Sequence, residues 1–258
     1  MSSESHLSDK DEKVLEVQDL GAIDYNDAWG YQTTLHKHLI KRKREAEYRA
    51  TLLDGDKYAH YLLLCEHNPV FTLGKSGKES NVLLDEGELH DKGIVFNKIN
   101  RGGDITYHGP GQLVGYPILD LDDFFTDVHK YVRCLEEVVI RVLADYGIEG
   151  YREKDYTGVW VTTGSAPHRR KICAIGVHLS RWVSMHGFAF NIENDLTPFS
   201  YIVPCGINDP DRTVCNLNDL TSQKVSVEEV KDAVVHHFSE VFQVKTRDGK
   251  PYLLSTNI

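Results

Sequence analysis

The sequence predicts an α+β fold, because short strands and amphipathic helices are mixed along it without a regular βαβ rhythm. The chain has 258 residues, of which 41% are hydrophobic, and this fits one large domain or two small ones. It contains no internal repeat and no low-complexity linker. We therefore expect residues 13–258 to form a single domain, preceded by a loose polar tail over residues 1–12.

The elements of the first half follow from short apolar runs and one long charged segment. We expect a strand at 13–18 and a helix at 25–48 whose second half is very basic. The run AHYLLL predicts a buried strand at 59–64. Two more strands, at 94–99 and 113–120, flank a segment rich in glycine.

A clear amphipathic helix follows, because apolar residues recur at three- and four-residue steps. These residues are Val128, Val132, Leu135, Val139 and Val142. Thr126 is expected to cap the start of this helix, and Gly147 to mark its end.

The second half of the chain contains mostly strands. They are expected at 158–163, 171–179, 186–192, 241–246 and 251–254. Ser226 and Glu229 are spaced as a capping box, which predicts one further helix at 226–241.

Composition and charge exclude several classes of protein. The net charge of −10 and the pI near 5.7 argue against nucleic acid as the main partner. No apolar run approaches the roughly 18 residues of a transmembrane helix, so no membrane partner is expected. The first residues, MSSESHLSDKDEK, have no apolar stretch and no arginine, and they are typical of neither a signal peptide nor a mitochondrial transit peptide.

The cysteine pattern bears on compartment and on metal binding. The five cysteines are an odd number, and no two are spaced as CxxC. This pattern favours neither a disulfide framework nor a structural zinc site. We expect free thiols in a reducing cytoplasm, with no metal and no other bound cofactor.

Residues 101–112 form the most informative segment, RGGDITYHGPGQ, and the apolar stretch LVGYPILDL follows it. Glycine has no Cβ and lets a backbone approach a ligand closely. Tyr107 and His108 supply the side chains that would contact the ligand. The segment is typical of a pocket lining, and a Gly-rich turn between two strands is the alternative.

Cys205 and Lys171 are the candidate reactive residues. Cys205 lies between Pro204 and Gly206, which together can present a thiol at the end of a strand. Lys171 opens an apolar strand, whose alternation allows it to face inward. A buried structural cysteine and a solvated lysine are the alternatives. Cys173 competes as a nucleophile, but we expect it to fill the core.

Several segments in one order resemble a known family. They are HNPVFTLG (67–74), RGGDITYHGPGQ (101–112), KICAIG (171–176), HGFAFN (186–191) and PCG (204–206). They resemble the motifs of the octanoyltransferases of protein lipoylation, the lipoyl(octanoyl) transferases of the biotin/lipoate protein ligase superfamily. Proline disfavours helix at the residue before it, so we expect Asn68 to lie in a fixed turn that forms a pocket wall. A structural role without contact to substrate is the alternative.

The resemblance implies roles for individual residues. Cys205 is the expected acyl-thioester nucleophile, and Lys171 is expected to stabilise its thiolate or to take its proton. The expected substrate-binding residues are Arg101, Gly102, Gly103, Asp104, Ile105, Thr106, Tyr107, His108, Ala174, Ile175, Gly176, Gly187, Phe188 and Ala189.

The resemblance also implies a fold and a reaction. The fold is a mixed, mainly antiparallel sheet with packed helices, similar to the catalytic domains of biotin and lipoate ligases. The reaction moves an octanoyl group from octanoyl-acyl carrier protein to a lysine of an apo lipoyl domain, through a cysteine thioester. The implied acceptors are lipoyl domains of 2-oxoacid dehydrogenase E2 subunits and the glycine cleavage H protein.

Three other functions stay open. They are an ATP-dependent lipoate-protein ligase, an octanoyl or lipoyl amidotransferase, and a binding module without enzymatic activity. Acyl carrier proteins and lipoyl domains are usually acidic, so a basic docking patch is expected. The candidates are the run Lys41, Arg42, Lys43 and Arg44, and the pair Arg169 and Arg170.

Overall fold

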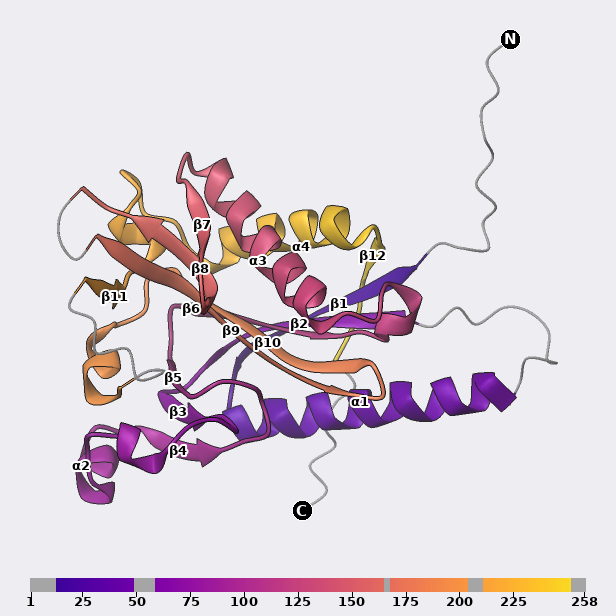
Figure 1. Cartoon of the computed structure of the whole chain (residues 1–258), viewed down its shortest axis with the longest axis horizontal. Coiled ribbons are helices and arrows are strands. Elements are labelled where there is room, and N and C mark those ends of the chain that lie inside the picture. The colour runs from indigo at the N-terminus through magenta and orange to yellow at the C-terminus, as the bar shows by residue number, and fades with distance from the viewer. Residues whose placement is uncertain (1–12, 49–58, 165–167, 204–210, 252–258) are drawn as a thin grey trace, which may run out of the picture.

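Two sheets form the scaffold of the computed structural model, which describes residues 13–48, 59–164, 168–203 and 211–251 (Figure 1). The larger sheet has the order β12-β1-β2-β6-β10-β9-β8-β7, and β11 pairs with β9. Its strands are β1 (Val14–Ile23), β2 (Ala59–His67), β6 (Gln112–Ile118), β7 (Gly150–Glu153), β8 (Tyr156–Thr162), β9 (Arg169–Ser180), β10 (Val183–Asn191), β11 (Arg212–Val214) and β12 (Lys245–Asp248).

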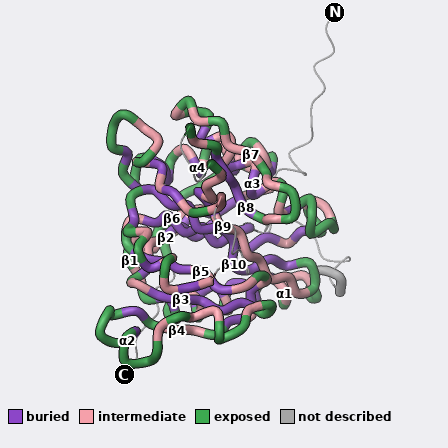
Figure 2. The backbone as a smooth tube through the Cα atoms, turned by 60° about the vertical axis from the view of Figure 1, so that its left-hand side comes forward, coloured by how far each residue is buried: buried purple, intermediate pink, exposed green. Residues whose placement is uncertain are grey.

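The smaller sheet packs beside the first and has the order β4-β3-β5. Its strands are β3 (Val70–Leu73), β4 (Val95–Lys98) and β5 (Ile105–His108). The short helix α2 (Glu86–Asp91) lies next to it at the outer end of the molecule (Figure 1). Figure 2 shows β3 and β5 largely buried and α2 largely exposed.

Antiparallel pairs predominate, as the sequence predicts. The run from β2 through β6, β10, β9 and β8 to β7 is antiparallel throughout. Strand β1 is parallel to both β2 and β12, and β11 is parallel to β9. The predicted α+β class with a mixed, mainly antiparallel sheet is confirmed.

Helices cover both faces of the larger sheet. α3 (Val128–Asp145) and α4 (Val227–Phe242) lie on one face, and α1 (Tyr25–Tyr48) lies on the other (Figure 1). Alternation along β2 supplies both cores: Leu62 and Leu64 pack toward α3 and α4, whereas Leu63 packs toward α1. In the described part of the chain, no helix is both long and apolar enough to cross a membrane.

Most helix boundaries agree with the sequence analysis. The helix at 25–48 is confirmed, and Ser226 and Glu229 form the expected capping box. Gly147 adopts the left-handed region (φ 71°) just after α3. The Thr126 cap is wrong: the carboxylate of Asp127 accepts the Lys130 amide at 3.0 Å, because the helix begins one residue later.

The strand expected at 241–246 is wrong in its first half. α4 continues to Phe242, because the Phe238 and Phe242 rings stack in the core at 4.3 Å, and β12 begins only at Lys245. The expected tail (1–12), and all but the first residue of the expected strand at 251–254, lie outside the described residues.

Candidate functional site

The glycine segment crosses directly over β9. The Gly102 amide donates to the Val177 carbonyl at 2.9 Å. A Cβ at Gly176 would lie 2.9 Å from the Gly102 carbonyl oxygen, closer than side chains tolerate. Two of the predicted pocket segments therefore meet at this crossing, and glycine is required there because backbone lies against backbone.

A turn that follows β3 holds the same segment from the other side. The Lys75 and Ser76 amides donate to the carbonyls of Arg101 and Gly103, at 3.0 and 3.1 Å. A Cβ at Gly74 would lie 2.3 Å from the Gly103 carbonyl oxygen. The end of the HNPVFTLG segment thus fixes the position of the RGG turn.

Arg101 anchors the segment through its side chain. Its guanidinium donates to the Thr72 carbonyl at 2.6 Å, to the Thr72 hydroxyl at 3.1 Å and to the Gly102 carbonyl at 2.9 Å. The side chain is buried at the junction between the two sheets. Its observed contacts hold backbone in place, which is a supporting role for the pocket.

His108 is a buried, neutral imidazole with a defined tautomer. The Gln112 amide nitrogen donates to the carbonyl of Tyr107 and to Asn191, so its oxygen faces His108 and accepts from Nδ1–H at 2.8 Å. Nε2 therefore carries the lone pair, which faces the Thr72 hydroxyl at 3.4 Å. Burial, reinforced by neighbouring His67 and Arg101, lowers the pKa of His108 to about 3.

A second buried histidine supports this arrangement. His67 donates from Nδ1 to the Ile23 carbonyl at 2.9 Å, and its Nε2 accepts from the Tyr116 hydroxyl at 2.7 Å. The Tyr25 ring stacks on His108 with centroids 5.9 Å apart and meets the His67 ring edge-on. The HNPV segment places His67 in the interior, and its chain bends at Asn68 and Pro69 as expected.

The remaining residues of the segment divide between the two sides of β5. Tyr107 and Ile105 point into the core of the smaller sheet, where Tyr107 meets the rings of Phe71 and Phe199 edge-on. Burial raises the pKa of Tyr107 to about 12. The Asp104 carboxylate accepts the Ile105 amide and the Asn81 side chain, both at 2.7 Å. Thr106 is half-buried.

The two predicted acyl-binding segments pair residue for residue. On β9 and β10, Ala174 lies opposite Ala189, Ile175 opposite Phe188, and Gly176 opposite Gly187. The three β10 residues are buried and the three β9 residues are half-buried. A Cβ at Gly187 would meet the Gly115 carbonyl oxygen at 2.2 Å, so this part of the sheet requires small residues.

Lys171 lies on the same strand, where β9 runs between β8 and β11. It pairs with Trp160 on one side and with Val214 on the other. Its ammonium lies 4.9 Å from the centre of the buried Trp160 ring. The spacing from Lys171 to Gly176 corresponds to about 16 Å of extended chain. One strand therefore carries both the candidate catalytic lysine and the glycine crossing.

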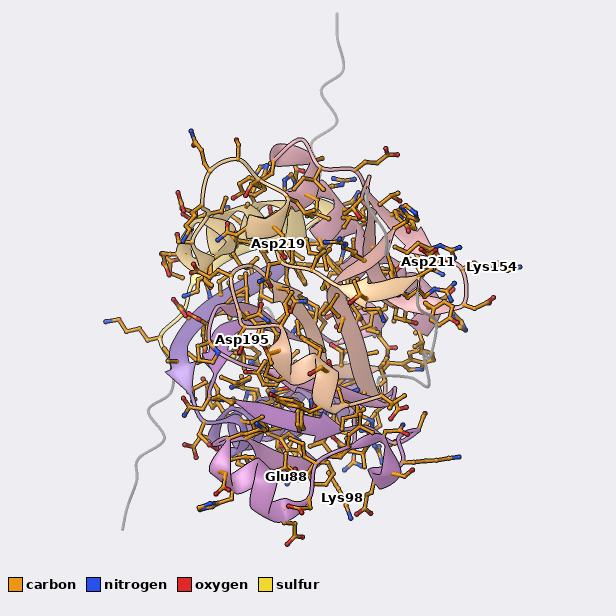
Figure 3. The ribbon with its side chains drawn as sticks, turned by 90° about the vertical axis from the view of Figure 1, so that its left-hand side faces the viewer. Glu88, Lys98, Lys154, Asp195, Asp211 and Asp219 are labelled. Atoms are coloured by element: carbon orange, nitrogen blue, oxygen red, sulfur yellow. The ribbon has the colours of Figure 1, made fainter. Side chains whose placement is uncertain are left out.

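Cys205 lies outside the described residues, which stop at Val203 and resume at Asp211. The Val203 amide donates to the Asn81 carbonyl at 2.8 Å. At the other end, the Asp211 carbonyl accepts the Arg169 amide at 3.3 Å, and β11 then runs alongside Lys171. Figure 3 labels Asp211 and also Lys154, which lies between β7 and β8; Arg169 pairs with both Asp211 and Glu153, the residue before Lys154.

The described cysteines are Cys65, Cys134, Cys173 and Cys215, and all are free thiols. Burial raises the pKa of each, and that of Cys215 reaches about 12. Cys173 is wholly buried in the core, as expected. These four thiols are protonated at neutral pH, so they are poor nucleophiles.

The two basic patches differ in position and in pairing. Lys43 binds Asp120 and Asp122 at 2.7 and 2.5 Å and donates to the Arg181 carbonyl. This contact places it at the far end of β9, about 33 Å of extended strand from Lys171. Arg169 lies beside Lys171 and pairs with Glu153 and Asp211, at 3.3 and 3.4 Å.

Several supporting residues were not predicted from the sequence. Thr72 and Gln112 orient Arg101 and His108, and Trp160 lies under the Lys171 ammonium. The i,i+4 spacing of His108 and Gln112 inside one motif was an available signal for Gln112. The sequence contained no signal for Trp160, because its contact with Lys171 depends on the pairing of β8 with β9.

The chain is similar to known proteins over most of its length. The family model described as the lipoyl protein ligase A/B catalytic domain matches residues 24–239. A protein named octanoyltransferase from Flavobacterium psychrophilum is 52% identical over 233 residues, which covers 89% of this chain and 97% of that protein. One of the same name from Christiangramia forsetii is 49% identical over 236 residues, which covers 91% and 98%.

Solved structures support the fold. The bi-partite lipoate protein ligase from Thermoplasma acidophilum superposes with a TM-score of 0.64 at 19% identity, covering 93% of this chain and 86% of that chain. A lipoate-protein ligase A bound with ATP gives a TM-score of 0.64 at 20% identity, covering 93% and 89%. The predicted similarity to lipoate ligase catalytic domains is therefore confirmed at the level of fold.

Proposed function

Because this chain belongs to the lipoyl protein ligase A/B catalytic domain family and is an acyltransferase, we propose that it transfers an octanoyl group from octanoyl-acyl carrier protein to a lysine of an apo lipoyl domain. The observation that carries this proposal is the near-complete match, at about half identity, to proteins named octanoyltransferase. It is also supported by strand β9, which carries both Lys171 and the glycine crossing at Gly176.

The first half-reaction makes a thioester on the enzyme. The Cys205 thiolate attacks the carbonyl carbon of the carrier thioester, and the carrier leaves as a free thiol after it takes up a proton. Lys171 stabilises the thiolate as an ammonium or takes the thiol proton. The choice of Cys205 as nucleophile is supported by the four described cysteines, because burial raises the pKa of each and makes its thiol a poor nucleophile.

The second half-reaction regenerates the enzyme. The amine of the acceptor lysine attacks the Cys205 thioester, an octanoyl amide forms, and the cysteine leaves as the thiolate. The two half-reactions share one acyl-enzyme, so the kinetics are ping-pong. The acyl chain is proposed to lie along the Ala174–Gly176 and Gly187–Ala189 pairing, beside the glycine crossing.

The proposed acceptors are the lipoyl domains of 2-oxoacid dehydrogenase E2 subunits and the glycine cleavage H protein. The ligase from Thermoplasma acidophilum, which shares this fold, belongs to a lipoylation system that includes its E2 lipoyl domain. Of the two basic patches, the Arg169–Arg170 pair is the better placed to dock an acidic carrier, because it adjoins Lys171. A reduced Cys205 is consistent with a cytoplasmic location.

Turnover without ATP tests the proposal against its nearest alternative. The enzyme is incubated with octanoyl-acyl carrier protein and an apo lipoyl domain, and the octanoylated domain is measured by mass. We expect product without ATP, and none from free octanoate. Product that requires ATP and the free acid would show a lipoate-protein ligase. A preference for an octanoylated lipoyl domain over octanoyl-acyl carrier protein as the donor would show an amidotransferase.

A further inference from the structure

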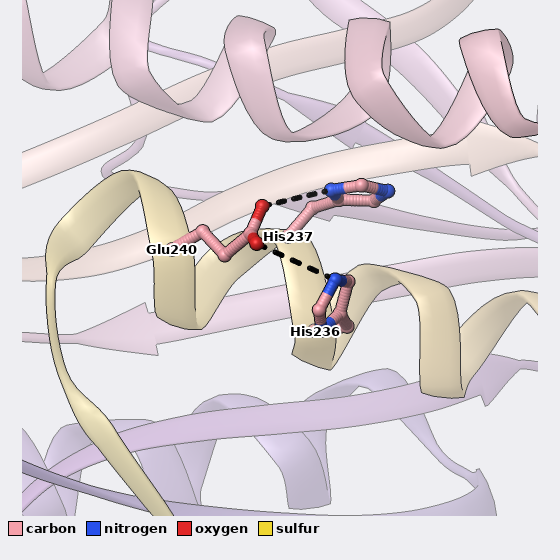
Figure 4. Close-up of side chains that lie close together, drawn as sticks. All are labelled: His236, His237 and Glu240. Atoms are coloured by element: carbon pink, nitrogen blue, oxygen red, sulfur yellow. Dashed lines mark ion pairs between the residues drawn. The ribbon is translucent and has the colours of Figure 1, made fainter.

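Three potential metal ligands gather on the last turns of α4, away from the acyl-transfer site. Figure 4 shows the Glu240 carboxylate between the imidazoles of His236 and His237. The His236 Nε2 atom lies 3.6 Å from one carboxylate oxygen, and the His237 Nδ1 atom lies 3.5 Å from the other. The donor atoms of the three side chains all lie within 4.8 Å of one another.

The tautomer of His237 is set by a second helix. Its Nε2 lies 2.7 Å from the Asp145 carboxylate at the end of α3, so Nε2 carries the hydrogen. Nδ1 then presents a lone pair toward Glu240. This atom is buried and makes no hydrogen bond within the described part of the chain. Nδ1 can therefore act as a ligand for a cation that Glu240 also binds.

The distances favour a metal ion over a proton. A charge-assisted N–H···O bond spans about 2.7–2.9 Å, so a bridging proton would leave shorter gaps than 3.5 and 3.6 Å. Zinc bonds of about 2.0–2.1 Å in tetrahedral geometry separate neighbouring ligand atoms by about 3.4 Å. Both gaps around Glu240 match that separation.

We propose that His236, His237 and Glu240 bind a divalent transition-metal ion of the Zn²⁺ class. Two imidazoles and one carboxylate suit Zn²⁺, Co²⁺ or Ni²⁺, whereas Mg²⁺ and Ca²⁺ prefer oxygen ligands alone. Asp145 orients His237 from behind, as carboxylates do in zinc sites. Water completes the coordination. Arg141 reaches Glu240 at 3.4 Å and is displaced toward Glu137 when metal binds.

The cysteine pattern, on which the expectation of no metal rests, does not test for this site. The signal is the run His-His-x-x-Glu at 236–240, which places three donors on one helix turn. Asp145 lies 92 residues from His237 in the chain, so the sequence alone could not show that it orients His237. The site is independent of the proposed acyl transfer.

Calorimetric titration of the metal-free full chain with Zn²⁺ tests the proposal. We expect one ion per chain, bound at least tenfold more weakly by H236Q, H237Q and E240Q. H90Q is the matched control, because His90 also neighbours a carboxylate (Asp91, 3.7 Å) but in an exposed pair without a third donor. It should bind Zn²⁺ as the wild type does. The titration is repeated in C205S to exclude thiol ligation.

Stability supplies a readout that activity does not. Saturating Zn²⁺ should raise the melting temperature of the wild type and of C205S, and leave H237Q and E240Q unchanged. Circular dichroism of the two variants without metal establishes that they are folded. Equal Zn²⁺ affinity in all variants, or binding that disappears only in C205S, would overturn the proposal. So would imidazole NMR signals of His236 and His237 that Zn²⁺ does not alter.

Discussion

Replacing Gly176 with alanine tests the contact that joins the two predicted pocket segments. The added Cβ would lie 2.9 Å from the Gly102 carbonyl oxygen, whereas ordinary contacts begin near 3.4 Å, so the backbone of the glycine segment must move by about half an ångström. Overpacking of this kind costs about 1–3 kcal/mol. The shift also weakens the Gly102 hydrogen bond to Val177, at about 1 kcal/mol or less.

The assay is urea unfolding of Gly176→Ala, combined with steady-state octanoyl transfer. We expect the free energy of unfolding to fall by about 1–3 kcal/mol, and kcat/KM to fall about tenfold or more, because misplacement near 1 Å can cost about a hundredfold. Gly30→Ala is the control, since its Cβ meets nothing within 4 Å on an exposed helix position, and it should stabilise by up to about 1 kcal/mol. A Gly176→Ala enzyme as stable and active as the wild type would refute the reasoning.

Three further predictions concern other parts of the structure. Trp160→Leu removes the ring under Lys171 and should slow single-turnover acylation about 2- to 30-fold, from about 0.5–2 kcal/mol, whereas Trp160→Phe retains most of the rate; equal rates for both would exclude the positioning role. Folded His108 has a pKa of about 3 against 6.5 for a free imidazole, so unfolded chains bind the extra proton and stability falls as the pH drops through that window. His108→Gln should flatten this decline in a pH series of urea unfolding, and an unchanged slope would contradict the assignment. Asp127→Ala should cost about 1 kcal/mol of stability, with Thr126→Ala within about 0.5 kcal/mol of the wild type; the reverse order would favour Thr126 as the cap.

The helices could be predicted from local sequence patterns. The periodic apolar residues predicted α3, and the Ser226–Glu229 spacing predicted the start of α4, because both depend on contacts within a few residues. The error at 241–246 arises from tertiary packing. The local sequence around Phe242 is typical of a strand, but the Phe242 ring stacks on Phe238 inside the core and extends the helix. Thr126 and Asp127 are both good capping residues, and only the three-dimensional start of α3 decides between them.

The smaller sheet and the geometry of the site could not be predicted from the sequence. β3 and β5 have four residues each, too short for a period-two pattern to stand out from a glycine-rich loop. The motif identified Gly102, Gly176 and His108, but it could not show that Gly102 lies on Gly176. The contact of Lys171 with Trp160 depends on register across β8 and β9, and sequence does not specify that pairing.

Intact-mass spectrometry after mixing the enzyme with octanoyl-acyl carrier protein, without ATP, tests the central claim most directly. We predict a gain of one octanoyl group on the wild type and on Cys173→Ser, its absence from Cys205→Ser, and its loss when an apo lipoyl domain is added. An adduct that persists in Cys205→Ser, or no adduct in any enzyme that still turns over, would contradict the proposed thioester intermediate.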